Sequence, residues 1–335
     1  MKPISVVILN WNGLNLLKEF LPRVLDASNL EISEIIVADN GSTDGSCDYV
    51  KWMGLPLIRF DKNHGFAEGY NLAIKQIESK YTILLNSDVA PRKGWDTALF
   101  QFMETHPECG ACQPKILSWH YPEKFEYAGA CGGFIDRYGY PYCRGRIFGT
   151  VETDSGQYQT PMEIDWATGA ALMVRTELYK EVGGLDASFF AHMEEIDLCW
   201  RIRLSGHSIW VCPESEVMHL GGGSLPMGNP RKTYLNFRNN LLLLHKNLPD
   251  SDRKKILFRR RLLDTIAWVK SVITFNFADA KAILRAHNDY RKMAPDVIPT
   301  NAKENLIANR PNILVKYFLC RKTRWSSLKI SNKSR

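Results

Sequence analysis

The residues of this chain that are best suited to chemistry lie in three short polar clusters, each of which follows an apolar or aromatic segment. The clusters are Asn86-Ser87-Asp88, Glu194-Glu195-Ile196-Asp197 and His219-Leu-Gly-Gly-Gly. Asp88 follows the apolar residues 81–85, which we expect to form a strand. A carboxylate at such a place suits a hard divalent cation that binds beside a diphosphate. The sequence therefore predicts a metal at Asp88 and a phosphorylated ligand, in one site shared by the three clusters.

The first half of the chain alternates between apolar, β-branched runs and segments in which apolar residues have helical spacing. The expected strands are residues 4–9, 35–38, 55–60 and 83–85, and the expected helices cover residues 14–25 and begin again at Tyr70. This repeated alternation predicts an α/β fold with a parallel sheet between layers of helices. Ligands bind beyond the carboxyl ends of such strands. The residues that fall there are Asn12, Asp39, Gly65 and Asp88.

Length and composition favour one large domain with an appendage. The chain has 335 residues, of which 45% are hydrophobic, so it can bury a large core. Residues 1–250 hold 23 Lys and Arg against 30 Asp and Glu, whereas residues 251–335 hold 20 against 6. This change of charge, together with a turn signal near Pro249, predicts a catalytic domain of residues 1–249 and a basic helical region of residues 250–335.

The eight cysteines are scattered along the chain, and no signal peptide is recognisable at its start. A chain of this length does not need disulfides, so we expect free thiols in a reducing cytosol and a cytoplasmic protein. The alternative is a zinc cluster formed by Cys109, Cys112, Cys131 and Cys143, but the later spacings match no common zinc finger. Small buried hydrophobic side chains are the simpler interpretation.

The loop after the second expected strand suits a nucleotide base. A carboxylate such as Asp39, at the end of a buried strand, can accept the imide N–H of uracil or thymine, and Gly41 would let the backbone approach the ligand. Ser42, Thr43 and Asp44 have a simpler interpretation, in which they cap a helix and shape a turn. No Gly-x-Gly-x-x-Gly follows these strands and the chain has no Gly-x-x-x-x-Gly-Lys, which argues against a dinucleotide-binding fold and a P-loop ATPase.

Eight short motifs occur in the order in which one enzyme family has them. They are NWNG at residues 10–13, DNGSTD at 39–44, NHGFAEGYN at 63–71, LLNSD at 84–88, GAALMVR at 169–175, GGLD at 183–186, EEIDLCWR at 194–201 and HLGG at 219–222. Together they resemble family 2 glycosyltransferases of the rhamnosyltransferase-like kind, over residues 3–245. The resemblance implies a GT-A fold, which is a Rossmann-like nucleotide-binding sheet flanked by helices. It also implies a nucleotide diphosphate sugar donor, a Mg²⁺ or Mn²⁺ cofactor and inversion of the anomeric centre.

The resemblance assigns nucleotide and metal roles to individual residues. Residues 86–88 match the family's Asp-x-Asp metal motif, with Asp88 as the surviving carboxylate. His219 matches the second protein ligand of the metal, although it could also end a strand and bond to the backbone; the glycines that follow favour the ligand. The residues assigned to the nucleotide are Asp39 for the base and Asn12, Gly65, Asn86 and Ser87 for the rest of the cleft.

Sugar transfer to a hydroxyl needs a base, because an alcohol that keeps its proton attacks the anomeric carbon poorly. The family takes this base from the second member of a Glu-Asp pair at the start of a helix, and that position holds Glu195 here. Glu194 stays open as the base or as a residue that orients the acceptor. In the alternative interpretation, these carboxylates and Asp197 only favour the helix dipole, by roughly 0.3–1 kcal/mol each.

The diphosphate leaving group and the sugar need further residues. The glycine-rich segment 221–232 ends in Arg231 and Lys232, which could close over the diphosphate as a lid, or it could be a surface loop. Arg238, in an expected helix over residues 234–245, is also assigned to the diphosphate, the alternative being a solvated or ion-paired arginine. The residues assigned to the sugar or acceptor pocket are Trp166, Gly169 and Ala170, with a core tryptophan as the alternative for the first.

An apolar stripe with basic edges runs along the expected C-terminal helix. The stripe consists of Phe258, Leu262, Ile266, Val269 and Ile273, and its edges of Lys254, Lys255, Arg259, Arg260 and Arg261. This pattern is typical of a helix that lies on an anionic bilayer, here the inner face of the cytoplasmic membrane. The alternative is that the stripe packs on the catalytic domain. The uncharged residues 271–278 are far fewer than the roughly 20 that a membrane-spanning helix requires.

These interpretations converge on an enzyme that transfers a sugar, such as rhamnose, from a nucleotide diphosphate sugar to a hydroxyl of a cell-surface glycan or a lipid-linked saccharide. Nucleic acid is not an expected partner. Two alternatives remain open: an inactive nucleotide-sugar-binding protein, suggested by Asn86 and Glu195, and a nucleic-acid-binding protein. The second would use basic and aromatic residues of the tail, namely Arg321, Lys322, Arg324 and Trp325.

Overall fold

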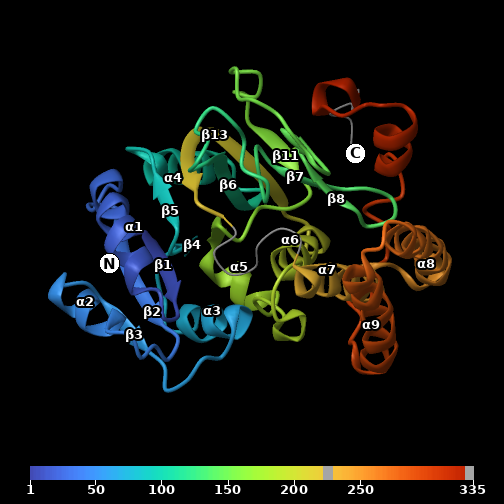
Figure 1. Cartoon of the computed structure of the whole chain (residues 1–335). Helices are drawn as coiled ribbons and strands as arrows, with labels where there is room; N and C mark the ends of the chain where they lie inside the picture. The colour runs from blue at the N-terminus through green and yellow to red at the C-terminus, as the bar shows by residue number, and fades with distance from the viewer. Residues whose placement is uncertain (222–228, 329–335) are drawn as a thin grey trace.

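The structure is a computed structural model that describes residues 1–221 and 229–328 (Figure 1). Within these residues, nine strands form one large mixed sheet. Eight of them lie in the order β11 (Met162–Ile164), β13 (Ser208–His219), β6 (Cys109–Ser118), β12 (Ala171–Arg175), β4 (Tyr81–Asn86), β1 (Ile4–Asn10), β2 (Ser33–Asp39) and β3 (Leu57–Arg59). The ninth, β5 (Val89–Pro91), pairs with β13.

The four strands expected from the sequence are present, and they are parallel. β3, β2, β1 and β4 lie side by side in that order. The expectation of a wholly parallel sheet is wrong beyond β4, because β12 runs antiparallel to both β4 and β6, and β5 and β11 run antiparallel to β13. The alternation of strand and helix on which that expectation rested ends after β6. Residues 119–170, which connect β6 to β12, contain only short strands and no helix. Without a helical crossover, β12 can run antiparallel to β6.

Apolar side chains alternate between the two faces of the central strands, and each face packs against its own helices. In β1, Val6 and Ile8 belong to one core and Val7 to the other. The first core is closed by α1 (Leu14–Ala27), α2 (Ser46–Trp52) and α4 (Trp95–Thr105), and the second by α3 (Phe66–Ile74), α5 (Thr176–Glu181) and α6 (Glu194–Leu204). Because both faces are covered, the ends of the strands are where polar side chains can converge.

The C-terminal region is helical, as the sequence predicts, and it shares a core with the rest of the chain. It contains α8 (Asp250–Ile273) and α9 (Phe277–Met293), which pack on each other and on α7 (Pro230–Asn247) (Figure 1). The tail then returns to a small antiparallel sheet of β7 (Gly133–Ile135), β8 (Pro141–Cys143), β9 (Arg146–Ile147) and β10 (Thr150–Val151). There the ring of Trp325 packs 4.2 Å from that of Phe134. Trp325 is buried, so it is not available to stack on a nucleic acid base.

The cysteines are free thiols, as expected, and all but Cys320 are buried. Among the described residues, no three His, Cys, Asp or Glu side chains converge in a way that could hold a metal. All four cysteines of the zinc-cluster alternative lie in the described part, so this alternative has no geometric support. Burial raises the pKa of the thiols of Cys131 and Cys143. These side chains act as small hydrophobic core residues.

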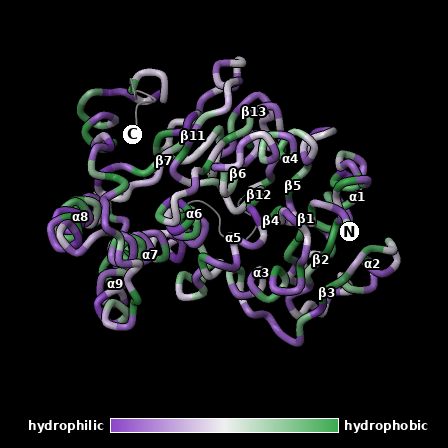
Figure 2. Tube along the Cα trace, turned by 180° about the vertical axis from the view of Figure 1, so that it is seen from behind, coloured by the Kyte–Doolittle hydropathy of each residue, from purple (hydrophilic) through white to green (hydrophobic). Residues whose placement is uncertain are grey.

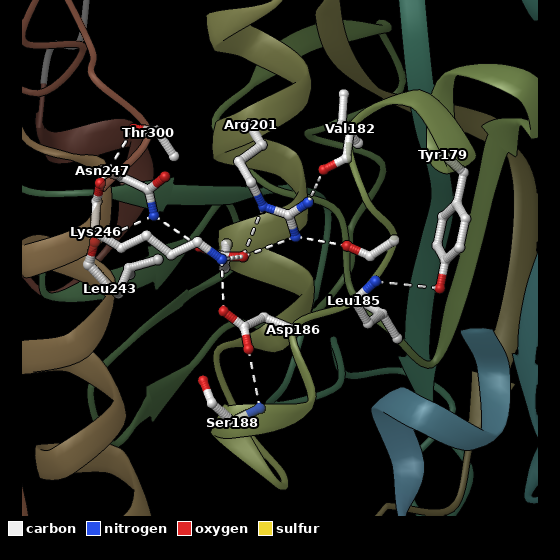
Figure 3. Close-up of polar contacts among 12 residues, drawn as sticks. Tyr179, Val182, Leu185, Asp186, Ser188, Arg201, Leu243, Lys246, Asn247 and Thr300 are labelled. Atoms are coloured by element: carbon white, nitrogen blue, oxygen red, sulfur yellow. Dashed lines mark hydrogen bonds and ion pairs between the residues drawn. The ribbon is translucent and has the colours of Figure 1, made fainter. Parts of the chain in front are cut away.

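A buried ionic network fixes α6 against α7 and against the loop that precedes α6 (Figure 3). Asp197 has no exposed surface, and it bonds to three side chains: Arg201 at 2.7 Å, Lys246 at 2.9 Å and Asn247 at 2.7 Å. Lys246 also pairs with Asp186 at 2.6 Å, and Arg201 donates to two backbone carbonyls of the preceding loop. The GGLD and EEIDLCWR motifs thus meet in this network, and Asp197 does more than favour a helix dipole.

We expect the substitution Asp197→Ala to lower the free energy of unfolding by about 3–5 kcal/mol, because it removes a buried carboxylate that two cations share. Urea denaturation followed by circular dichroism measures the change. The matched control is Glu177→Ala, which removes a largely exposed carboxylate from an ion pair with Lys180 and should leave the midpoint almost unchanged. A wild-type midpoint for Asp197→Ala would show that the network does not stabilise the fold.

Candidate active site

The structure brings Asp88 and His219 into direct contact. β5 begins immediately after Asp88 and pairs antiparallel with the end of β13, so that His219 lies opposite Val89. The backbone N–H of Leu220 also donates to the carbonyl of Asp88, at 3.0 Å. As a result, Nε2 of His219 lies 3.2 Å from Oδ1 of Asp88. Two residues that are far apart in the sequence therefore meet beyond the carboxyl end of β4.

A third side chain, Glu126, joins this pair, and sequence reasoning missed it. Its Oε1 lies 3.7 Å from Nδ1 of His219. Gly221 has a φ of 66°, and a Cβ atom there would lie 3.0 Å from the same carboxylate oxygen, so the chain needs a glycine where it passes Glu126. Glu126 comes from the irregular segment after β6 and belongs to no motif or periodic pattern, so the sequence carried no signal for it.

Asp88 and His219 shift each other's pKa. Burial alone would lower the pKa of His219, but the contact with Asp88 and the charges of Asp88 and Glu126 outweigh burial and raise this pKa to about 10. Burial alone would raise the pKa of Asp88, but the hydrogen bond and charge of His219 hold it below its usual value. The cluster in this structure is therefore an imidazolium held between carboxylates.

Asp88 and His219 fit a Mg²⁺ or Mn²⁺ ion as part of its ligand set. The protein set is incomplete: Glu126 approaches the imidazole of His219, but no group of three His, Cys, Asp or Glu side chains in residues 1–221 and 229–328 is arranged to hold a metal ion. Mg²⁺ is usually held by one or two carboxylates together with substrate phosphates and water, so a nucleotide-dependent site does not need more. Nδ1 of His219 is buried and has no hydrogen-bond partner, which leaves the ring unsatisfied in the present arrangement. Asp88 and His219 would hold a divalent cation together with the donor, and the cation would supply positive charge to the diphosphate.

The loops after β1 and β2 are locked together at the same edge of the sheet. The amide of Asn10 donates to Asp39 at 3.1 Å, and the backbone N–H of Ser42 donates to the other carboxylate oxygen at 2.9 Å. Asn12 donates its backbone N–H to the Ser42 hydroxyl at 2.8 Å and accepts from the backbone of Thr43 at 2.8 Å. Burial would raise the pKa of Asp39, but the bonds from Ser42 outweigh it and lower this pKa. Asp39 has no exposed surface and shapes the loop in this conformation.

A third loop, directly before α3, packs onto these two through Asn40. The amide of Asn40 donates to the side chain of Asn63 at 3.0 Å and to the carbonyl of Gly65 at 2.9 Å. Gly41 has a φ of 77°, and a Cβ atom there would lie 2.5 Å from the backbone of Lys62. The close approach of the neighbouring loop therefore requires a glycine at position 41. From the sequence, we expected the close approach of a ligand to require it. The three loops form one continuous wall along the ends of β1, β2 and β3.

The turn that contains Gly169 and Ala170 connects the end of β4 with Glu195. The backbone N–H of Asn86 donates to the carbonyl of Ala170, at 3.0 Å. A Cβ atom on Gly169 would lie 3.7 Å from Cβ of Glu195. Asn86 and Ser87 are only half-buried, so they can contact a ligand. The carboxylates of α6 thus lie close to the strand end that carries Asp88.

Glu194 and Glu195 begin α6, as the sequence predicts. Glu194 is buried and Glu195 half-buried, and each has one buried carboxylate oxygen without a hydrogen-bond partner. Burial raises the pKa of Glu195 to about 7. Burial, with the nearby charge of Glu195, raises the pKa of Glu194 well above its usual value. A carboxylate that exchanges its proton near neutral pH suits general-base catalysis, and Glu195 meets this condition better.

The turn before Glu194, residues 189–193, is strained and is held by Asn239 and Arg238 of α7. Three non-glycine residues of the turn have φ between 65° and 76°, namely Phe190, His192 and Met193. The side-chain amide of Asn239 lies 2.7–2.9 Å from three carbonyl oxygens of the turn. Arg238 donates to one of the same carbonyls at 2.8 Å. These bonds fix the direction in which α6 starts, and with it the two glutamates.

The structure gives Arg238 and Trp166 roles other than those assigned from the sequence. Arg238 is buried and bonded to the turn before α6, so it is not directed at a diphosphate. Trp166 is 3% exposed, its indole N–H donates to the carbonyl of Phe134 at 3.1 Å, and its ring packs on Gly133. It therefore has no free face for a sugar. Residue type alone did not distinguish a buried arginine or tryptophan from a ligand-binding one.

The expected lid falls mainly on residues 222–228, which lie outside the described residues. Arg231 and Lys232 are in the first turn of α7. Arg231 is exposed, and its guanidinium lies 5.1 Å from the ring centre of Phe190. Lys232 is half-buried, and burial lowers its pKa, although the charge of Glu126 acts in the opposite direction. Lys232 thus places a positive charge near the Asp88–His219 cluster.

Comparison with known proteins identifies the family that this chain resembles. Residues 5–164 match the family model described as Glycosyl transferase family 2. The chain carries a glycosyltransferase family 2 domain. A low-salt glycan biosynthesis hexosyltransferase, Agl10, of Haloferax volcanii is 23% identical to this glycosyltransferase, over 71% of this chain and 74% of its own. An N-acetylglucosaminyl-diphospho-decaprenol L-rhamnosyltransferase of Mycobacterium tuberculosis is 25% identical, over 64% of this chain and 75% of its own.

Solved structures confirm that this glycosyltransferase has a GT-A fold with a helical C-terminal region. TarS 1-349 of S. aureus, in complex with UDP-GlcNAc, superposes with a TM-score of 0.56 at 17% identity, over 88% of this chain and 82% of that one. The mannosyltransferase PcManGT of Pyrobaculum calidifontis, in complex with GDP-Man and Mn²⁺, has a TM-score of 0.53 at 13% identity, over 88% and 83%. At these sequence identities, structural similarity shows a shared fold only.

We expect Asn239→Ala to reduce the turnover number for sugar transfer by about 10- to 100-fold, because releasing the strained turn shifts the glutamates that begin α6. Donor affinity should stay within about twofold of wild type, since Asn239 does not contact the nucleotide wall. Steady-state kinetics and donor titration separate the two effects. The control is Asn236→Ala, which truncates a half-buried residue of the same helix. Equal losses in donor affinity and turnover would contradict a positioning role for Asn239.

Proposed function

We propose that this glycosyltransferase inverts the anomeric centre and transfers a sugar from a nucleotide diphosphate donor to a hydroxyl of a cell-surface glycan or a lipid-linked saccharide. The contact between Asp88 and His219, close to the strand end that faces Glu195, carries this proposal. The similarity to a decaprenol-linked L-rhamnosyltransferase favours rhamnose and a lipid-linked acceptor. Such an acceptor would require work at a membrane surface, which we propose to be the inner face of the cytoplasmic membrane.

The donor would lie along the wall formed by the three loops, with its diphosphate at the Asp88–His219 cluster. The nucleotide-binding residues in this proposal are Asn12, Asp39, Gly65, Asn86 and Ser87. Asp39 would reach the base only if its loop opens, because its carboxylate is fully buried. When bound, Mg²⁺ or Mn²⁺ would neutralise charge on the departing diphosphate. Lys232, with Arg231 at the surface, would add positive charge to the same end of the donor.

Glu195 would act as the general base. Its carboxylate would take the proton of the acceptor hydroxyl while the oxygen attacks the anomeric carbon from the side opposite the diphosphate, which leaves with the bonding electron pair. One displacement of this kind inverts the anomeric centre. The raised pKa of Glu195 makes its carboxylate a better proton acceptor than an ordinary one. Glu194, which is buried behind it, would orient Glu195 or the acceptor.

We expect Mn²⁺ to strengthen binding of the cognate nucleotide sugar by at least about tenfold over binding in EDTA, because an ion held with the help of Asp88 would neutralise charge on the diphosphate. Calorimetric titration with dTDP-, UDP- and GDP-sugars identifies the donor and measures the increment. In Asp88→Asn the increment should vanish, while the residual affinity in EDTA persists. The control is Asp61→Asn, which alters an exposed carboxylate in the loop before α3. A full Mn²⁺ increment in Asp88→Asn would remove Asp88 from the metal site.

We expect turnover to rise about tenfold per pH unit below pH 7 and to level off above it, because the base must be deprotonated and burial raises the pKa of Glu195 to about 7. Initial rates of nucleoside diphosphate release at saturating donor, acceptor and metal give this profile. Glu195→Gln should lose about 100-fold or more in turnover while it still binds donor.

Glu194→Gln is the matched variant for the base, since it changes the neighbouring carboxylate and should lower turnover much less than Glu195→Gln does. If Glu194→Gln abolishes turnover and Glu195→Gln does not, the base is Glu194. If both variants keep their donor affinity and their turnover, neither glutamate is the base.

A further inference from the structure

The apolar stripe of α8 faces away from the protein. Its members, each at least 41% exposed, are Phe258, Leu262, Ile266, Val269 and Ile273. The opposite side of the helix is buried through Ile256, Leu257, Arg260 and Asp264. Figure 2 shows hydrophobic and hydrophilic residues interspersed along α8. Of the two interpretations that the sequence left open, packing of the stripe on the catalytic domain is therefore wrong.

Polar contacts fix this orientation of α8. Arg260, which the sequence assigned to the basic edge of the stripe, is instead buried, donates to Asp264 at 2.8 Å and stacks 3.8 Å from the ring centre of Tyr140. His287 of α9 approaches the other oxygen of Asp264 at 3.1 Å. Rotating the helix to bury its stripe would break these contacts and expose Ile256 and Leu257, which are now buried. The outward direction of the stripe is thus a property of the folded chain.

Two phenylalanines extend the stripe at the turn between α8 and α9. Phe275 is 79% exposed and Phe277 is 61% exposed, and their ring centres lie 6.1 Å apart. Phe275 also has a φ of 57°, a conformation that bulky residues rarely adopt. A glycine or asparagine would fit this turn with less strain. The backbone strain at Phe275 and the exposure of its ring indicate that this residue serves a function and does not stabilise the turn.

The surroundings of the stripe are positively charged. Between Arg253 and Ala278 the single acidic residue is Asp264, which is fully buried. At about 100° per residue, Arg259 and Lys270 lie along one edge of the stripe and Lys254 and Arg261 along the other. Exposed apolar side chains between two basic edges match the headgroup and acyl layers of an anionic bilayer.

We propose that this surface, which consists of the α8 stripe, its basic edges, Phe275 and Phe277, docks on an anionic lipid bilayer. The helix would lie in the plane of the interface, with its apolar side chains among the acyl chains and its cations at the phosphates. None of the described helices is both long enough and apolar enough to cross a membrane.

Other partners match this surface less well. In a symmetric pair of chains this surface would meet its own basic edges, and it contains no acidic residue to pair with them. A nucleic acid would leave the stripe without a partner, because it presents charge but no extended apolar layer. Docking on lipid does not depend on which sugar or acceptor the enzyme uses.

Flotation of the full chain with vesicles tests this proposal without an activity measurement. We expect the protein to float with phosphatidylcholine–phosphatidylglycerol vesicles and to remain unbound with pure phosphatidylcholine, and we expect high salt to weaken the binding. Phe275→Ser/Phe277→Ser should lower the partition coefficient by about 30-fold. Lys254→Glu/Arg259→Glu/Lys270→Glu should lower it by about 100-fold or more. These positions are exposed, so circular dichroism and donor binding should match wild type.

Matched controls at the other end of the molecule separate this surface from general charge or hydrophobicity. Trp52→Ser removes a 78% exposed aromatic residue from α2, which lies opposite α8 in both views (Figures 1 and 2). Lys18→Glu/Lys51→Glu/Lys75→Glu reverses three exposed charges on α1, on α2 and just after α3. Both controls should float like wild type.

Four outcomes would overturn the proposal. One is that wild-type protein fails to float with anionic vesicles, and another is that the α8 variants float like wild type. A third is self-association that the Phe275→Ser/Phe277→Ser variant loses, which would assign the surface to a second copy of the chain. The fourth is binding to a DNA or RNA oligomer that the charge variant loses and the phenylalanine variant keeps, which would assign it to nucleic acid. Donor binding is measured separately, so failure of lipid docking and failure of the proposed enzymatic function are distinguishable.

Discussion

The antiparallel pairing of β5 with the end of β13 is the interaction on which the active site depends. β5 has three residues, starts directly after Asp88 and sets His219 opposite Val89. On the other side of β13, the carbonyl of His219 accepts the backbone N–H of Trp119 at 3.0 Å. The backbone of His219 is therefore held on both sides. A slip of one residue in this register would turn the imidazole to the other face of the sheet. The contact between Asp88 and His219 thus depends on a strand pairing rather than on a contiguous motif.

The carboxylates that begin α6 are held by a different support. α6 is tied to α7 by the Asp197 network at its middle and by Asn239 at the turn before it. Three left-handed residues in that turn carry strain of roughly 1–3 kcal/mol each, and a cluster of buried hydrogen bonds offsets it. The sheet therefore positions Asp88 and His219, while the helical layer positions Glu194 and Glu195. The reacting centre lies where these two supports meet.

The sequence was informative where one local pattern determined the outcome, and uninformative where tertiary contacts did. The apolar runs before Asp39 and Asp88 predicted parallel strands, and the acidic pair before a helical pattern predicted the start of α6. Glu126 belongs to no pattern, because its position follows from the path of an irregular segment. Trp166 and Arg238 were assigned to ligands because the same residue types serve in cores and in binding sites. Only burial and hydrogen-bond partners separate these uses.

The orientation of α8 carries one more step of argument. A helix on the surface of a protein in water ordinarily buries its apolar side, and each large apolar side chain left exposed forgoes about 1.5–3 kcal/mol of stabilisation. α8 does the reverse, since its buried side includes the ion pair of Arg260 and Asp264 while Phe258 and Ile266 face outward. A buried ion pair gives little net stability compared with apolar residues of similar size. The arrangement is unfavourable if water surrounds α8 on its outer side. It becomes favourable if that side meets an apolar layer bounded by negative charge.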